Sequence, residues 1–240
     1  MKILVLNGSP KEKSETFRLT GAFLEGLTRY VSHEVQVIHV IKKNIAPCIG
    51  CFGCWERADN HCVIQDDLNS ILDGLLAADL VIWNFPVYVC GVPGHLKTLL
   101  DRTLPLTRQE RNAEGNLYKP VHIRTMFISG CGSPDHEGNF NGVKQTFFHQ
   151  FGQSLAICVP QTPILSNRDT AEAAEALLRR FRLAGEEFCI LGTLLPETLA
   201  NLESPVYPKG EYLEMYKRWY GGLHAKKSFE GCNKPAGSRF

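Results

Sequence analysis

The chain has 240 residues, of which 44% are hydrophobic and 21% charged, a balance typical of one globular domain or of one domain with an extension. Its net charge of +1 lacks the basic excess that is typical of nucleic-acid-binding proteins. The sequence has no apolar run of the ~18–20 residues that a membrane span needs, and the apolar opening segment is too short for a signal peptide, so we expect a cytoplasmic protein that binds neither membranes nor nucleic acids.

Five short apolar runs predict β-strands, and helical patterns separate them. The strand runs are Ile3–Leu6, Val35–Val40, Leu80–Trp83, Met126–Ile128 and Leu155–Val159. Helices are expected to begin near Ser14, after Asp66 or Asp67 and at Pro93, and to run through Phe140–Phe151 and Ala173–Phe188. The alternation predicts the α/β class: a three-layer, doubly wound, five-stranded parallel sheet with right-handed crossovers. We expect the strand order 2-1-3-4-5, one of the common orders of doubly wound sheets.

Two segments depart from this alternation. A Cys-rich insertion occupies residues 44–65, between the second strand and the second helix. A C-terminal extension, residues 196–240, follows the predicted domain of residues 1–195. The extension is rich in tyrosine and should contain one short helix around Tyr212–Trp219. We expect it to pack on the domain or to form an oligomer interface.

The loop after the first strand has the composition of an anion site. Gly8, Ser9 and Pro10 turn the chain, and Lys11, Ser14 and Thr16 add a positive charge and hydroxyls at the start of a helix. Backbone N–H groups and the helix dipole favour a bound anion there. Neither G-x-x-x-x-G-K-[ST] nor G-x-G-x-x-G is present. The loop suits a monophosphate such as that of FMN; the alternative is a polar turn with an ordinary helix cap.

The loops after the third and fourth strands add an apolar wall. Ligands of doubly wound sheets bind beyond the carboxyl ends of the strands, where the strand order reverses. Here the third strand is followed by an apolar loop with one aromatic side chain, suited to a flat ring, and the fourth by glycines that permit close backbone approach. These two loops are residues 84–93 and residues 129–134.

Four of the nine cysteines are clustered, in the spacing Cys48-x₂-Cys51-x₂-Cys54-x₇-Cys62. Three evenly spaced thiolates with a fourth close behind fit the corners of an iron–sulfur cubane. Zinc also takes four thiolates, but usually from two separated C-x₂-C pairs. Free thiols, or a cluster lost in air, remain a further interpretation.

Together these motifs resemble the NAD(P)H-dependent FMN reductase and iron–sulfur flavoprotein branch of the flavodoxin-like superfamily. The resemblance rests on L-N-G-S-P…S-x-T, P-V-Y…L-K…D-R and C-I-G-C-F-G-C…C-V-I-Q-D-D, over about residues 1–165. It implies FMN, and a [4Fe–4S] cluster held by the four clustered cysteines. It also implies a set of phosphate ligands: Ser9, Lys11, Ser14, Glu15 through its backbone, and Thr16. By the same resemblance the isoalloxazine would be lined by Pro86, Val87, Tyr88, Val89 and Gly91 and closed from the other side by Gly130, Cys131 and Gly132. Lys11 and Glu15 depart from the arginine and asparagine that are usual at these positions.

By this resemblance the chain is an FMN-dependent oxidoreductase, a homodimer or homotetramer in which a cluster can approach a neighbour's flavin. It would transfer electrons between a one-electron donor such as ferredoxin and a small-molecule acceptor. The alternative is an NAD(P)H-dependent reductase of flavin, quinone or nitro compounds without a working cluster, and a third is a binding module without turnover. No catalytic acid or base is singled out: His95 is interpreted as exposed or capping, and Lys97, Asp101 and Arg102 as helix surface and ion pairing.

Overall fold

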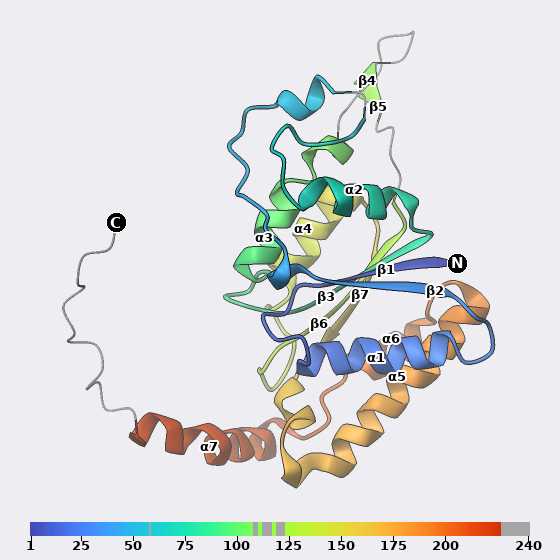
Figure 1. Cartoon of the computed structure of the whole chain (residues 1–240). Coiled ribbons are helices and arrows are strands. Elements are labelled where there is room, and N and C mark those ends of the chain that lie inside the picture. Colours follow the sequence, from blue (N-terminus) through green and yellow to red (C-terminus); the bar gives the residue numbers. More distant parts are fainter. Residues whose placement is uncertain (58, 108–109, 112–116, 119–122, 227–240) are drawn as a thin grey trace, which may run out of the picture.

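The central element of the computed structural model is a twisted parallel sheet (Figure 1). The structure describes residues 1–57, 59–107, 110–111, 117–118 and 123–226. Within this described part, five strands pair in the order β2-β1-β3-β6-β7, all of them parallel. This is the predicted order 2-1-3-4-5, so the flavodoxin-like fold is confirmed. The strands are β1 (Lys2–Asn7), β2 (Glu34–His39), β3 (Leu80–Pro86), β6 (Thr125–Gly130) and β7 (Leu155–Val159); a separate antiparallel pair is β4 (Glu110–Arg111) and β5 (Leu117–Tyr118).

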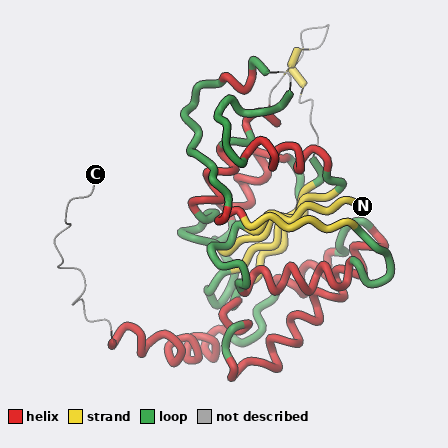
Figure 2. The backbone as a smooth tube through the Cα atoms, viewed as in Figure 1, coloured by secondary structure: helices red, strands yellow, loops and turns green. Residues whose placement is uncertain are grey.

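Helices cover both faces of the sheet (Figure 2). One face carries α1 (Glu15–Leu27), α5 (Ala171–Leu191) and α6 (Pro196–Glu203), and the other α2 (Leu68–Ala77), α3 (Gly94–Asp101) and α4 (Asn141–Phe151). Each face has its own buried apolar cluster. The short 3₁₀ helices are η1 (Val40–Lys42), η2 (Gly53–Trp55), η3 (Leu104–Thr107), η4 (Thr162–Leu165) and η5 (Arg168–Thr170).

Local signals set the helix starts close to where the sequence predicts them. The Ser14 hydroxyl caps α1 by accepting a hydrogen bond from Phe17 N at 3.2 Å. Before α2 the capping side chain is Asp66, whose carboxylate accepts from Leu68 N at 3.1 Å. Pro93 stands directly before α3, where its missing N–H costs the helix no hydrogen bond.

The C-terminal extension contributes to the same core as the domain. Leu202 of α6, together with Tyr212 and Met215 of α7 (Lys209–Lys226), is buried in the cluster beneath α1 and α5. The far end of α7 projects away from the sheet (Figure 1). A domain boundary at residue 195 stays a prediction. No helix in the described ranges has the length and apolarity needed to cross a bilayer.

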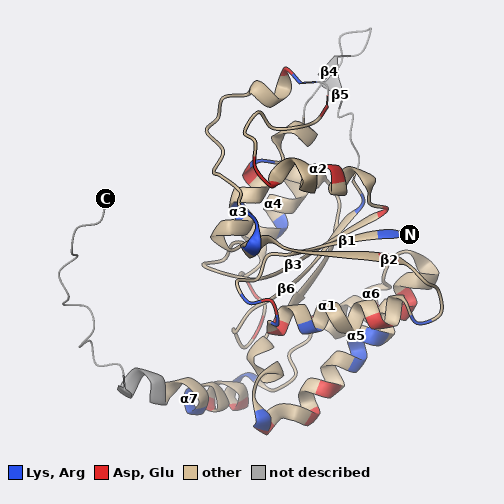
Figure 3. Cartoon of the chain, in the orientation of Figure 1, with Lys and Arg blue, Asp and Glu red and all other residues tan. Residues whose placement is uncertain are grey.

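The contact between α1 and α5 depends on two glycines. A Cβ added to Gly26 would lie 1.9 Å from the Arg182 carbonyl oxygen, and one added to Gly185 would lie 2.0 Å from that of Phe23. The helix backbones therefore touch. At the margin of this contact, ion pairs such as Arg29–Glu186 at 2.6 Å lie among mixed charges on the outer surface (Figure 3).

We predict that Gly26→Ala lowers the free energy of unfolding by about 1–3 kcal/mol, because the methyl group forces two helices apart. Gly21→Ala, on the same helix with open space around its Cβ, is the matched control and should raise stability by up to ~1 kcal/mol through helix propensity. Urea unfolding measures both. Equal stabilisation by the two substitutions would contradict the close helix contact.

Candidate functional site: a flavin edge and a cysteine hollow

Three loops are joined at the edge of the sheet where the strands end. Gly8 N, after β1, donates to the Asn84 carbonyl of β3 at 2.7 Å, and Val87 N, after β3, donates to the Gly130 carbonyl of β6 at 2.8 Å. A Cβ added to Gly130 would lie 2.7 Å from Thr16 Cγ2, so the third loop also touches the start of α1. The residues predicted for a flavin therefore belong to loops that contact one another at the switch point.

The first loop is shaped by its own side chains. Asn7 Oδ1 accepts from Ser9 N at 3.0 Å, and Ser9 Oγ accepts from Lys11 N at 3.2 Å. These bonds curl the chain around the amino end of α1. Of the predicted phosphate residues, Ser9, Ser14 and Thr16 are buried and Lys11 is exposed.

At the start of α1, two hydroxyls and two backbone amides converge. Ser14 Oγ and Thr16 Oγ1 lie 3.1 Å apart. The N–H groups of Glu15 and Thr16 are in the first turn, where an α-helix provides no carbonyl partner. The Glu15 carboxylate accepts from Ser166 Oγ at 2.6 Å, across from the helix start. The Glu15 carboxylate, which is unusual in a phosphate loop, therefore has Ser166 as its partner. The backbone N–H of Glu15 is available to a bound anion.

The second loop is a tight exposed hairpin. Tyr88 and Gly91 exchange two backbone hydrogen bonds of 2.9 and 3.0 Å around Val89 and Cys90, which both have left-handed φ values of 50° and 55°. A β-branched residue rarely adopts such a φ, so the turn stores backbone strain beside the site. Val89 is fully exposed and Tyr88 is 50% exposed. The hairpin therefore presents apolar surface at the edge of the sheet.

The third loop is held from both sides. Cys131 N donates to the Val159 carbonyl at 2.9 Å, and burial raises the pKa of the Cys131 thiol. On the other side, Tyr212 OH of α7 donates to the Gly132 carbonyl at 2.8 Å. The Tyr216 ring also faces this glycine, since a Cβ added to Gly132 would lie 3.7 Å from Tyr216 Cε2. The aromatic extension thus packs directly against a loop predicted to contact flavin. Tyrosines at a spacing of four were visible in the sequence, but nothing there indicated their target.

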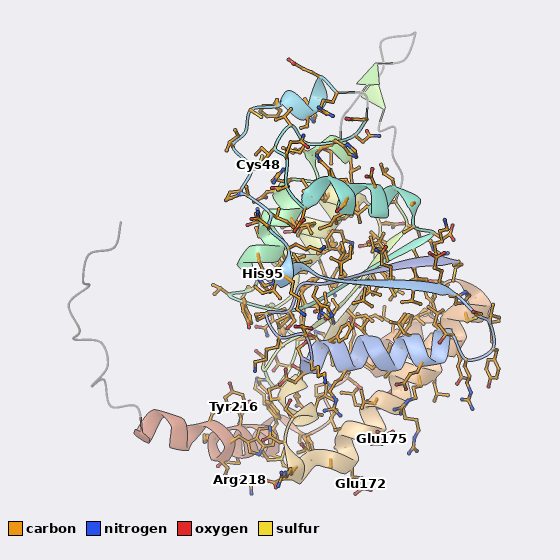
Figure 4. The ribbon with its side chains drawn as sticks, in the orientation of Figure 1. Cys48, His95, Glu172, Glu175, Tyr216 and Arg218 are labelled. Carbon is orange, nitrogen blue, oxygen red and sulfur yellow. The ribbon has the colours of Figure 1, made fainter. Side chains whose placement is uncertain are left out.

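His95 lies at the same edge and is more buried than the sequence interpretation allowed. It is at the start of α3, and its Nε2 is buried without a hydrogen-bond partner among the described residues. Burial lowers the pKa of His95, while a backbone hydrogen bond at Gly8 opposes this shift. The His95 ring therefore lies beside the first loop, where burial disfavours its charged form. Figure 4 shows His95, Cys48 and Tyr216 along the side of the molecule on which the strands end.

The four clustered cysteines line one hollow. Cys54 and Cys62 are buried in it, and Cys48 and Cys51 are exposed at its rim. Left-handed φ values at Gly50 and Phe52, with 3₁₀ helix η2 following, curl the segment. The structure thus brings together all four sulfurs that the spacing selects.

The geometry of the hollow does not decide which metal it fits. Among the described residues, no group of three or more His, Cys, Asp or Glu side chains is arranged to hold a single metal ion. A zinc ion needs its thiolates at about 2.3 Å from one centre, whereas a cubane spreads its ligands over separate iron corners. The choice between zinc and a cluster therefore rests on the spacing of the cysteines, three evenly spaced with a fourth close behind, and not on this arrangement. Burial, followed by the neighbouring Cys62, Cys51 and Cys48 sulfurs, raises the pKa of Cys54, which a bound metal would reverse.

Arg102 corrects the interpretation of the third helix. Lys97 and Asp101 form the expected exposed ion pair. The Arg102 side chain is instead fully buried, pairs with Asp66 and lines the cysteine hollow. The Asp-Arg dipeptide was part of the motif that carried the family resemblance, but its helical position alone suggested a surface residue. Arg102 is buried because the Cys-rich segment folds over the end of α3.

Exposed apolar side chains surround the mouth of the hollow. Ile49 is 72% exposed, Phe52 52% and Trp55 41%, and the Phe52 and Trp55 rings meet edge to face at 4.9 Å. We call these three residues the apolar rim. Contiguous exposed apolar surface is characteristic of interaction sites.

Comparison with known proteins agrees with this geometry. The family model described as NADPH-dependent FMN reductase matches residues 1–151. An iron–sulfur flavoprotein of Methanosarcina thermophila is 35% identical over 109 residues, which are 45% of this chain and 56% of the relative. Iron–sulfur flavoprotein MJ1083 of Methanocaldococcus jannaschii is 37% identical over 106 residues, 44% and 53% of the two chains. The chain therefore spans about half the length of these curated relatives.

Solved structures support the fold. An FMN-dependent NADH-azoreductase of Bacillus anthracis in complex with FMN superposes with a TM-score of 0.58 at 16% identity, over 78% of this chain and 99% of the other. At that identity the likeness concerns the fold alone. The match over residues 1–151 includes β1, β3, β6 and the first-strand loop, and on that basis the chain belongs to the NADPH-dependent FMN reductase family.

Proposed function

We propose that the chain is an FMN-dependent oxidoreductase whose flavin binds where the three loops meet. The observation that carries this proposal is the direct contact of the three loops at the switch point, in a member of an FMN reductase family. The phosphate is assigned to the start of α1, with Ser9, Lys11, Ser14, Thr16 and the Glu15 amide. The ring is assigned to the space between two loops: Pro86, Val87, Tyr88, Val89 and Gly91 on one side, and Gly130, Cys131 and Gly132 on the other.

We further propose that Cys48, Cys51, Cys54 and Cys62 hold a [4Fe–4S] cluster. All four line one hollow, and two curated relatives that match 45% and 44% of this chain are named iron–sulfur flavoproteins. When bound, FMN supplies one- or two-electron chemistry and the cluster supplies one-electron chemistry, which suits transfer from a donor such as ferredoxin to a two-electron acceptor. The protein holds the phosphate by amides and hydroxyls, orients the ring with stiff loops and shields Cys54 and Cys62 from water.

In an oligomer, a second copy of the chain would cover the exposed sulfurs. Cys48 and Cys51 open to solvent inside the apolar rim of Ile49, Phe52 and Trp55. A second copy seated on this rim would exclude water from the hollow and bring another flavin site towards it. We propose a homodimer or homotetramer on this ground.

The alternative is an NAD(P)H-dependent reductase of flavins, quinones or nitro compounds in which the cysteines carry no cluster. The description of the matching family names NADPH as the reductant. The exposure of Cys48 and Cys51 also favours this alternative, because thiolates open to water and oxygen hold a cluster less securely.

We predict that Thr16→Val weakens FMN binding about tenfold, because one charge-assisted hydrogen bond to the phosphate is lost. Riboflavin, which lacks the phosphate, should bind equally to both proteins. Thr28→Val, at the other end of α1, is the control. Fluorescence titration of the apoprotein measures all the affinities. If riboflavin binding weakens to the same extent, Thr16 does not contact the phosphate and the phosphate site lies elsewhere.

The cluster is tested by anaerobic purification. We expect about four irons and four sulfides per chain and broad absorption beneath the flavin bands. Cys54→Ser and Cys62→Ser should remove the iron and keep the FMN, whereas Cys189→Ser, outside the hollow, should keep both. Iron-free wild-type protein that still binds FMN would leave the NAD(P)H-dependent reductase as the function.

The electron donor is tested by bleaching of the bound flavin without oxygen. We expect reduced ferredoxin to bleach it through the cluster in the wild type but not in Cys54→Ser. If NAD(P)H bleaches both proteins at the same rate, the reductase alternative is favoured. Failure of both donors would support a binding module without turnover.

A further inference from the structure

Arg102 connects the two ends of the Cys-rich segment. Its Nη1 donates to the Ala46 carbonyl at 3.0 Å, two residues before Cys48, and its Nη2 donates to the Ile64 carbonyl at 3.3 Å, two residues after Cys62. Nη1 also pairs with the Asp66 carboxylate. One guanidinium thus closes the loop that carries all four sulfurs.

Asp66 completes this closure of the loop, and we call Arg102 and Asp66 together the clamp. Its carboxylate accepts from Ala46 N at 2.9 Å and from Leu68 N at 3.1 Å, and its side chain is only 5% exposed. Burial disfavours the charge on Asp66, but the Arg102 guanidinium and these backbone donors outweigh it and lower its pKa. The pair is therefore charged on both sides and fixed in place.

The clamp does not use the Nε–H donor of Arg102. Arg102 Nε is buried and has no hydrogen-bond partner among the described residues. A buried unpaired N–H is costly, so such a group indicates a partner that the protein side chains do not provide. Arg102 lines the same hollow as the four cysteines. Burial disfavours its charge, but Asp66 and the Cys62 sulfur outweigh burial and raise the pKa of Arg102.

We propose that Arg102 is the positioning residue of the cysteine site: it holds the segment closed through Ala46 and Ile64 and donates its remaining Nε–H to a sulfur at the cluster. This inference rests on the proposed cluster. A buried cation and an N–H···S bond stabilise the more negative, reduced form, so Arg102 sets a higher reduction potential than the thiolates alone would give. Asp66, by offsetting the cation, limits this effect.

The position of Arg102 also links the two proposed redox sites. It is the C-cap residue of α3, a helix of eight residues that begins next to the hairpin of the second loop. Such a helix spans about 12 Å. A single rigid element therefore carries the ring-binding hairpin at its amino end and the cysteine clamp at its carboxyl end.

The test uses full-length protein purified without oxygen. It compares wild type with Arg102→Gln, Arg102→Lys and Asp66→Asn, and with Lys97→Gln as the control on the exposed face of α3. Iron and sulfide analysis measures occupancy, and a potentiometric titration followed by electron paramagnetic resonance measures the reduction potential. FMN content reports on folding.

Arg102→Gln should retain FMN, lose part of its iron and shift the potential of the remaining cluster to more negative values. Arg102→Lys should recover more of the potential than of the iron, because an ammonium keeps the charge but not the fork of donors that closes the segment. Asp66→Asn should shift the potential in the opposite direction, which a purely structural clamp would not do. Lys97→Gln should change neither quantity.

Wild-type iron and potential in Arg102→Gln would overturn the inference and leave the cluster proposal standing. If Arg102→Gln does not fold, an unchanged or more negative potential in Asp66→Asn overturns it instead. Iron-free wild-type protein, by contrast, would overturn the cluster proposal and this inference together.

Discussion

Parallel backbone pairing of β1, β3 and β6 is the constraint on which the rest of the structure depends. It makes three strands end at one edge, and the loops that follow are then joined by the bonds Gly8 N to Asn84 O and Val87 N to Gly130 O. Small residues permit this approach, since a side chain at Gly130 would meet Thr16. The proposed anion site at α1 and the apolar hairpin lie at the edge that this pairing creates.

The helix α3 extends this edge towards the cysteines. Its amino end supports the hairpin and its carboxyl end supplies Arg102, around which the Cys-rich segment closes with Asp66. A buried ion pair contributes little net stability by itself, because desolvation opposes the attraction. Its value here is geometric: it fixes a long irregular segment that has little secondary structure of its own. The same charge is available to a group bound in the hollow.

The predicted strands and helices were confirmed where periodicity and capping agree. Continuous apolar runs identified β1 and β3, and Ser14 marked the start of α1. The interpretation of Arg102 as a surface residue was wrong, because helical position cannot show that a distant loop covers a helix end. The burial of His95 was underestimated for a similar reason: its backbone hydrogen-bond partner, Gly8, is far away in the sequence.

The sequence by itself determined the class of fold and the residue types of both candidate sites, because these follow from local periodicity and from closely spaced motifs. The strand order was expected from the common orders of doubly wound sheets and was confirmed by the pairing of the strands. Tertiary structure decided what no local pattern contains. It placed Tyr212 of α7 on the Gly132 loop and gave the Glu15 carboxylate a partner in Ser166. It also left Arg102 Nε without a hydrogen-bond partner in the part of the chain that the structure describes. Such contacts arise between segments far apart in the chain, and only the packing of the whole domain brings them together.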